Sequence, residues 1–139
     1  MNKCFYFFSW LSIMAGAIFI LLLTFWLVFP YRPIEFQDVE FSVKNTMVQR
    51  GKMLFYTANY CKYMKLSAKV TRSFVNSIIY VTPTTITDRP MGCNSLVIGT
   101  TVPQELPPGT YKAEMSYQFQ VNPIRTVIVK MTTEEFEVY

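Results

Sequence analysis

The pattern of hydrophobic and polar positions changes once along the chain, close to residue 30. Residues 5–29 are almost entirely apolar, and no Asp, Glu, Lys or Arg occurs between Cys4 and Tyr31. A helix needs about 20 apolar residues to cross the hydrocarbon layer of a membrane. The pattern therefore predicts one transmembrane helix over residues 5–29, preceded by a short tail of residues 1–4.

Aromatic side chains gather at both ends of this segment, as they do where a transmembrane helix meets the membrane surface. They are Tyr6, Phe7, Phe8, Trp10, Phe25, Trp26, Phe29 and Tyr31. Pro30 and Pro33 end the helix, because proline has no amide hydrogen to donate. The triplet at 15–17 has the small-x-small form of a signal-peptidase site. Cleavage there would leave a strongly hydrophobic new N-terminus, so we expect the helix to be retained as an anchor.

After Pro33 the apolar residues recur at every second position, which is the period of a strand with one buried face. The clearest case is 111–122, where every odd position is apolar or aromatic and every even position is polar. Val39, Phe41 and Val43 show the same alternation. The other strand candidates are 53–63, 73–82, 95–102, 126–131 and 136–139.

Some six or seven short strands with turn signals between them predict one small antiparallel β-sandwich, and the fold class is mainly β. Gly51, Gly92 and Pro103 are among the residues that mark the turns. We expect residues 30–37 to form a linker and residues 38–139 to form the sandwich domain.

The segment Leu106-Pro107-Pro108-Gly109-Thr110-Tyr111 resembles the Pro-Gly-x-Tyr entry to a late strand in immunoglobulin-like and fibronectin-III-like domains. In those families the tyrosine tethers the corner to nearby backbone, so the resemblance implies an immunoglobulin-like sandwich. Ala113 stands where antibody-type domains have a cysteine, so their inter-sheet disulfide is absent in this register. A single anchor followed by a small sandwich also resembles small uncharacterised membrane proteins of bacteria and tailed phages.

Composition narrows the classes of function. The formal charge is +4, and the Lys and Arg residues are scattered singly, so we expect no nucleic-acid partner. The chain has no histidine, the commonest metal ligand and the usual general base near neutral pH. It also has no nucleophile elbow and no glycine-rich phosphate loop. We therefore expect no enzymatic activity, no catalytic residue and no cofactor.

Four sulfur-containing residues provide the remaining candidate chemistry. Cys61 and Cys93 are the only cysteines after the helix, and they predict a disulfide if the domain lies in an oxidising compartment. Two buried free thiols are the alternative. Together with Met64 and Met91, which lie close by in the sequence, the two thiols also form a candidate Cu(I) site, because soft sulfur ligands suit that ion. Methionines of this kind are equally ordinary core residues.

The orientation in the membrane rests on few charges, with Lys3 before the helix and Arg32 and Lys44 after it. A short tail before the helix and a folded domain after it favour a single-pass signal-anchor in the cell inner membrane. The N-terminus would be cytoplasmic and the C-terminal domain periplasmic or extracellular. Ser12 and Gly16 have the small-residue spacing that lets two helices approach closely, which predicts a homodimer contact.

The sequence therefore predicts a non-enzymatic, membrane-anchored interaction module. The helix would contact membrane lipid, and the sandwich would meet another membrane or envelope protein of a bacterium or a phage. The alternative is an assembly factor or copper-handling protein for a membrane complex, which would use the cysteines and methionines.

Overall fold

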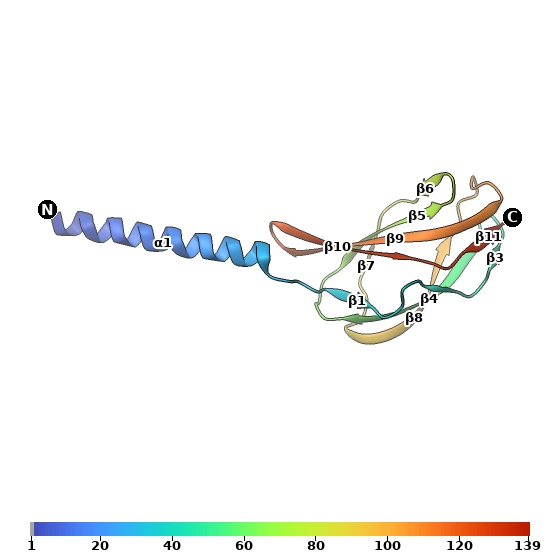
Figure 1. The fold of residues 1–139 in the computed structure, drawn as a ribbon, viewed down its shortest axis with the longest axis horizontal. Coiled ribbons are helices and arrows are strands. Elements are labelled where there is room, and N and C mark those ends of the chain that lie inside the picture. Colours follow the sequence, from blue (N-terminus) through green and yellow to red (C-terminus); the bar gives the residue numbers. More distant parts are fainter. Residues whose placement is uncertain (1) are drawn as a thin grey trace.

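The computed structural model describes residues 2–139, with side chains described from Tyr6 onward. One helix, α1 (Asn2–Val28), projects from a domain that contains two β-sheets, and the two termini lie at opposite ends of the molecule (Figure 1). Within the described residues α1 is the only helix, and all other regular elements are strands. The mainly β class and the N-terminal apolar helix are therefore confirmed.

α1 differs from the expected helix only at its ends. It begins at Asn2 instead of residue 5. Residues 2–5 contain no glycine or proline, so nothing in the backbone stops the helix from extending to Asn2. It ends at Val28, because Pro30 cannot continue the hydrogen-bond pattern. The part Tyr6–Val28 is long and apolar enough to cross a membrane, and no residue of its apolar window is buried in the structure.

The first sheet is built around β4 (Met53–Lys62). β1 (Ile34–Phe36) and β2 (Ser42–Val43) pair with one edge of β4, and β8 (Gly92–Thr101) pairs along the whole of the other edge. All three pairings are antiparallel. β1 lies inside the segment 30–37 that we expected to be a linker, and it forms because Ile34 packs into the core and pairs with the end of β4.

The second sheet is built around β9 (Gly109–Asn122) and β5 (Ala68–Val75), which pair in antiparallel fashion. On its other side β9 pairs first with β10 (Arg125–Thr132) and then with β11 (Phe136–Val138). The candidate strands 126–131 and 136–139 therefore correspond to β10 and β11.

Short strands complete this second sheet. β6 (Ile79–Val81) and β7 (Thr85–Thr87) pair with β5, and β3 (Met47–Val48) pairs in parallel with β11. The candidate strand 73–82 is divided here between β5 and β6. A tight turn separates them, in which the side-chain oxygen of Asn76 accepts a hydrogen bond from the amide of Ser77.

The core lies between the two sheets and contains large side chains from β4, β5 and β9. Within 111–122 the predicted alternation is confirmed, because Tyr111, Met115 and Phe119 are buried and Val121 packs against the core. Val39 does not follow its predicted alternation, since its side chain is 93% exposed in the turn before β2.

Tyr111 forms the tether that the resemblance implied. Its hydroxyl group donates a hydrogen bond of 2.9 Å to the carbonyl oxygen of Pro107, four residues earlier. This contact fixes the corner at which the chain enters β9.

Candidate functional site

Cys61 and Cys93 lie directly opposite each other on β4 and β8 and form a disulfide with an S–S distance of 2.04 Å. Their Cα atoms are 3.9 Å apart, closer than the ~4.4 to 6.8 Å usual for disulfides. The short distance follows from their position, because non-hydrogen-bonded partners in an antiparallel pair approach to about 4.5 Å. The bridge joins neighbouring strands of one sheet, unlike the inter-sheet bridge of antibody-type domains.

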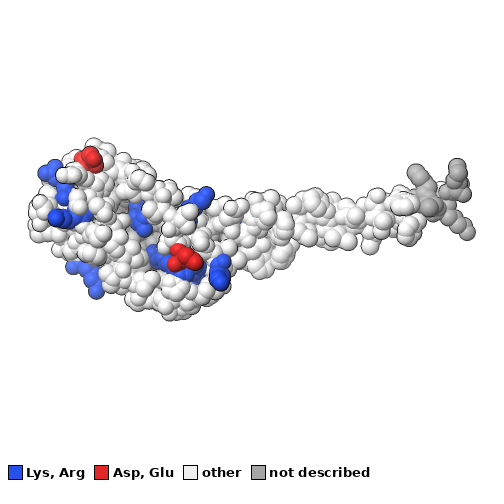
Figure 2. All heavy atoms as spheres, turned by 180° about the vertical axis from the view of Figure 1, so that it is seen from behind, with Lys and Arg blue, Asp and Glu red and all other residues white. Residues whose placement is uncertain are grey.

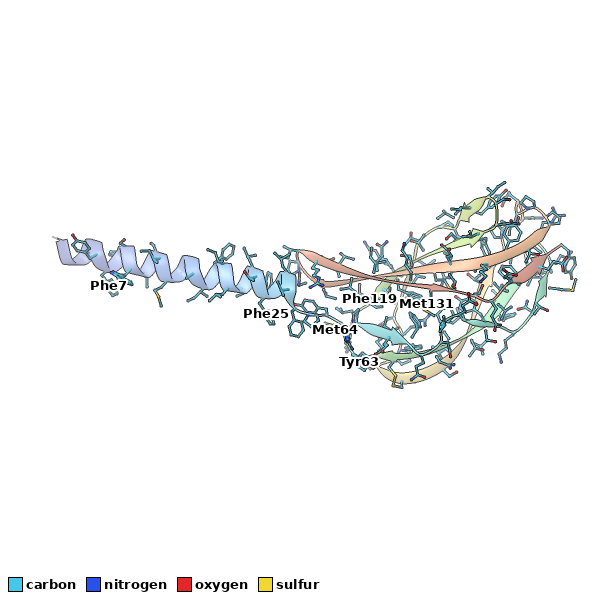
Figure 3. All side chains as sticks on the ribbon, in the orientation of Figure 1. Phe7, Phe25, Tyr63, Met64, Phe119 and Met131 are labelled. Carbon is cyan, nitrogen blue, oxygen red and sulfur yellow. A yellow bond between two sulfur atoms is a disulfide. The ribbon has the colours of Figure 1, made fainter. Side chains whose placement is uncertain are left out.

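The two methionines of the copper hypothesis lie outside regular strands. Met64 is half-buried just beyond β4, at the end of the domain that faces α1 (Figure 3), and Met91 is 49% exposed just before β8. Cysteines in a disulfide carry no thiolate for Cu(I), so the copper hypothesis requires prior reduction. In residues 2–139 no group of three or more His, Cys, Asp or Glu side chains is placed to hold a metal ion.

A buried lysine holds the segment that leads into β8. Lys62, the last residue of β4, is 2% exposed, and its Nζ donates to Asp88 Oδ1 at 2.9 Å and to the carbonyl oxygen of Arg89 at 2.7 Å. Both acceptors precede β8. The loop is therefore fixed at the same end of the sheet as the disulfide.

Arg89 reaches from this loop into the aromatic part of the core. Its guanidinium group donates to the hydroxyl of Tyr117 at 2.8 Å and lies over the rings of Phe36, Tyr60 and Tyr117 at 4.9 to 5.8 Å. Cation–π contacts of this kind add to the stabilisation from the hydrogen bond. The hollow next to Arg89 and Tyr117 has no room for a water molecule, so we regard this cluster as structural.

Burial raises the pKa of three core tyrosines, Tyr56, Tyr60 and Tyr117. Loss of hydration raises the pKa of Tyr56 and of Tyr117, because the phenolate would lose its contact with water. The positive charges of Arg72 and Arg89 act in the opposite direction on the pKa of both groups but do not reverse the shift. Both tyrosines therefore stay neutral well above their ordinary pH range.

β8 presents one edge without a strand partner. Among the described residues only β4 pairs with β8. The amide of Val102 donates to the carbonyl oxygen of Lys52, on the β4 side. The backbone N–H and C=O groups of an antiparallel strand point to alternate sides from one residue to the next. Val102 faces β4, so the backbone groups of the odd-numbered residues Ser95 and Val97 point away from β4. We call this unpaired side of Gly92–Thr101 the β8 edge.

The composition of the β8 edge leaves it open to pairing. β8 contains no charged residue and no proline over its ten residues, although natural edge strands usually carry such protection or are very short. Val97 is 54% exposed, and Phe55 of neighbouring β4 is 41% exposed. The edges of the other sheet differ, since β6 and β7 have three residues each and β10 carries Arg125 and Lys130.

Charge is unevenly distributed between the two parts of the molecule. Basic side chains are scattered over the visible face of the domain, with few acidic groups among them, and the described part of the helix from Tyr6 onward shows neither (Figure 2). This view contains no long basic stripe. From Tyr6 to Val28 the helix contains no charged residue, as expected from the sequence.

The junction between helix and domain is held by two polar side chains that we call the helix clamp, Asn122 and Arg125. Asn122 Nδ2 donates to the carbonyl oxygen of Trp26 at 3.0 Å. The guanidinium of Arg125 donates to the carbonyl oxygens of Leu27 and Phe29, both at 2.7 Å. α1 has no basic residue in its last turn, so Arg125 supplies the positive charge that favours a helix C-terminus.

No protein-family model and no curated protein sequence matches the chain. The features that bear on function are the apolar helix, the disulfide, the β8 edge and the helix clamp. The sequence revealed the cysteine pair. It gave no signal for the helix clamp, whose partners lie 96 to 98 positions apart.

Proposed function

We propose that the protein is a non-enzymatic, membrane-anchored interaction module. α1 crosses the cell inner membrane once with its N-terminus in the cytoplasm, and the domain lies in the periplasm or outside the cell. The observation that carries the proposal is the apolar span of 23 residues, whose window contains no buried residue. A helix that is apolar on all sides needs either a protein interior or lipid around it.

The strand pairings support an immunoglobulin-like sandwich. β4 pairs with β8 in one sheet while β5 pairs with β9 in the other, so these four strands, taken in chain order, alternate between the sheets as in a Greek key. β3 runs parallel to β11, and β10 and β11 follow β9 along its edge. The hydrogen bond from Tyr111 to Pro107 lies at the start of β9, where those domains have their tyrosine corner.

The disulfide supports a location outside the cytoplasm. Disulfides form and persist in the periplasm and outside the cell, whereas cytosolic thiols are kept reduced. The bridge between Cys61 and Cys93 fixes the start of β8 against the end of β4. It therefore also braces the strand that we propose as the interaction surface.

We place the partner on the β8 edge, as an extended, uncharged segment of another membrane or envelope protein. Strand addition of this kind gains affinity from main-chain hydrogen bonds and specificity from side-chain contacts. Ser95 and Val97 offer the backbone groups, and Val97 with Phe55 offers exposed apolar surface. The absence of charge on β8 fits an uncharged partner segment.

A homodimer through the membrane helix is compatible with this arrangement. Gly16 has open space around its Cα, and it shares one side of α1 with Ser12. A second helix can approach closely at such positions. This contact would leave the β8 edge free for the other protein.

A single backbone amide tests the proposal. Val97→Pro removes a donor that points away from β4, so it should spare the β4 to β8 pairing but block strand addition. Val97→Ala keeps the amide and is the matched control. A photo-crosslinking residue is placed at Ser95 of the full-length chain in cells, and a second one is placed at Ile86 on β7, which is 75% exposed.

We expect one discrete adduct with another membrane or envelope protein at Ser95, lost with Val97→Pro and kept with Val97→Ala. The residue at Ile86 should not give this adduct. Equal crosslinking in the proline and alanine variants would contradict strand addition. A self-adduct at Ser95 would show that a second copy occupies the edge, which also contradicts the proposed partner.

A further inference from the structure

The turn between β9 and β10 presents an apolar side chain next to the end of α1. Ile124 is 51% exposed, and its amide donates to Asn122 Oδ1 at 3.1 Å, which fixes the turn. The Nδ2 atom of the same Asn122 side chain donates a hydrogen bond to the carbonyl oxygen of Trp26 in the helix. The position of Ile124 is therefore set by the helix clamp, and Figure 1 shows this hairpin reaching the end of the helix.

The helix clamp also sets the depth of the turn relative to a membrane. The 23 residues Tyr6–Val28 measure about 34 Å at 1.5 Å per residue, slightly more than the ~30 Å hydrocarbon layer. Val28 must then lie close to the boundary of that layer. The three carbonyl groups bound by the helix clamp belong to Trp26, Leu27 and Phe29, which lie at the same level.

The side chains around this level are those of a membrane interface. Trp26, Phe29 and Tyr31 are aromatic, and such residues favour the headgroup region. The guanidinium of Arg125 lies 5.6 Å from the centre of the Tyr31 ring. Arginine places its charged end among headgroups while its aliphatic part contacts apolar surface.

We propose that the β9 to β10 turn is a lipid-contact site. Ile124 enters the interfacial layer of the leaflet in which α1 ends, and Arg125 lies at the level of the headgroups. The helix clamp thereby holds the domain against the membrane in one orientation. This also fixes the orientation of the β8 edge relative to the membrane. The proposal rests on the proposed function, because it requires α1 to span the bilayer.

Tryptophan quenching by brominated lipid measures the depth of the turn. Full-length protein is reconstituted into phosphatidylcholine vesicles with bromine near the upper end of the acyl chains. Trp10→Phe leaves Trp26 as the reporter of α1. The double variant Trp10→Phe with Trp26→Phe has no tryptophan and provides the background for Ile124→Trp. The helix clamp binds the backbone carbonyl oxygen of residue 26, which this side-chain substitution keeps. Ile86→Trp in the same background is the control, since Ile86 is 75% exposed on β7.

We expect tryptophan at 124 to lose most of its fluorescence and tryptophan at 86 to lose almost none. Adding Arg125→Gln should restore much of the signal at 124, because the helix clamp loses its bonds to Leu27 and Phe29. Quenching at 124 no greater than at 86, with Trp26 quenched, would overturn the lipid-contact site while leaving the anchor intact. Unchanged quenching at 124 in the Arg125→Gln variant would overturn the role of the helix clamp. An unquenched Trp26 would contradict the anchor itself.

Discussion

Tyr60 and Tyr117 bring hydroxyl groups into the same core in different ways. Arg89 donates to the hydroxyl of Tyr117, whereas the buried hydroxyl of Tyr60 has no hydrogen-bond partner among the described residues. Tyr117→Phe should lower the free energy of unfolding by about 1.5 to 3 kcal/mol, because it leaves a charged donor unpaired. Tyr60→Phe should be neutral or stabilising, because it removes a buried hydroxyl that has no partner to leave unpaired. Urea unfolding of the full-length protein in detergent compares the matched pair, and equal losses would contradict these roles.

Burial of the core tyrosines also predicts a loss of stability in alkali. The pKa of Tyr56 and of Tyr117 is raised above the ordinary tyrosine value of 10.0. The folded state then keeps protons that the unfolded state releases, so stability is complete below about pH 10 and falls as the pH rises further. The slope is at most about 1.4 kcal/mol per pH unit for each tyrosine. Urea midpoints from pH 8 upward measure it, and a constant midpoint into strong alkali would show that both phenols reach water.

At the scale of elements, β9 contributes more buried core residues than any other strand of the second sheet. Phe119 is 2% exposed, so Phe119→Ala should cost about 3 to 5 kcal/mol through lost contacts and a cavity. Gln120 is exposed on the opposite face of the same strand, and Gln120→Ala should change stability by less than about 0.5 kcal/mol. Thermal unfolding of the two variants compares the faces of β9. Similar melting temperatures would contradict the assignment of its buried face.

The disulfide between β4 and β8 predicts a second loss at this scale. The cysteines are 32 positions apart, and the chain-entropy model assigns a bridge over such a loop about 3 to 4 kcal/mol. Cys61→Ser with Cys93→Ser should therefore unfold at lower urea concentration, and reduced wild-type protein should match it. If reduction left the urea midpoint unchanged, the bridge would not form in the folded protein.

Long alternating segments could be predicted from the sequence, but several short strands, namely β1, β3 and β7, could not. β4, β8, β9 and β10 each have enough residues to show a period of two, and their positions were predicted to within a few residues. β1 and β7 have three residues each, and their burial depends on partners far along the chain. The cysteine pair could be found by counting. The β8 edge and the helix clamp could not, because both are properties of the assembled sheets.

At the scale of the whole molecule, α1 and the domain extend from one another, and the hairpin of β9 and β10 reaches back to the helix end (Figure 1). Phe25 lies in the last turns of the helix near this hairpin (Figure 3). The uncharged apolar span Tyr6–Val28 and the charged domain give the molecule two regions with different solvent requirements. The proposed anchored module rests on this division.

Alkaline carbonate extraction of membranes from cells that make the full-length protein tests this account most directly. The wild-type protein should stay in the membrane pellet, because the span Tyr6–Val28 is held by lipid. Ile18→Arg, near the middle of the span, should impair insertion by about 2.5 to 3.5 kcal/mol and shift protein to the supernatant, whereas Ile18→Ala should not. Complete release of the intact wild-type protein into the supernatant would contradict the membrane anchor.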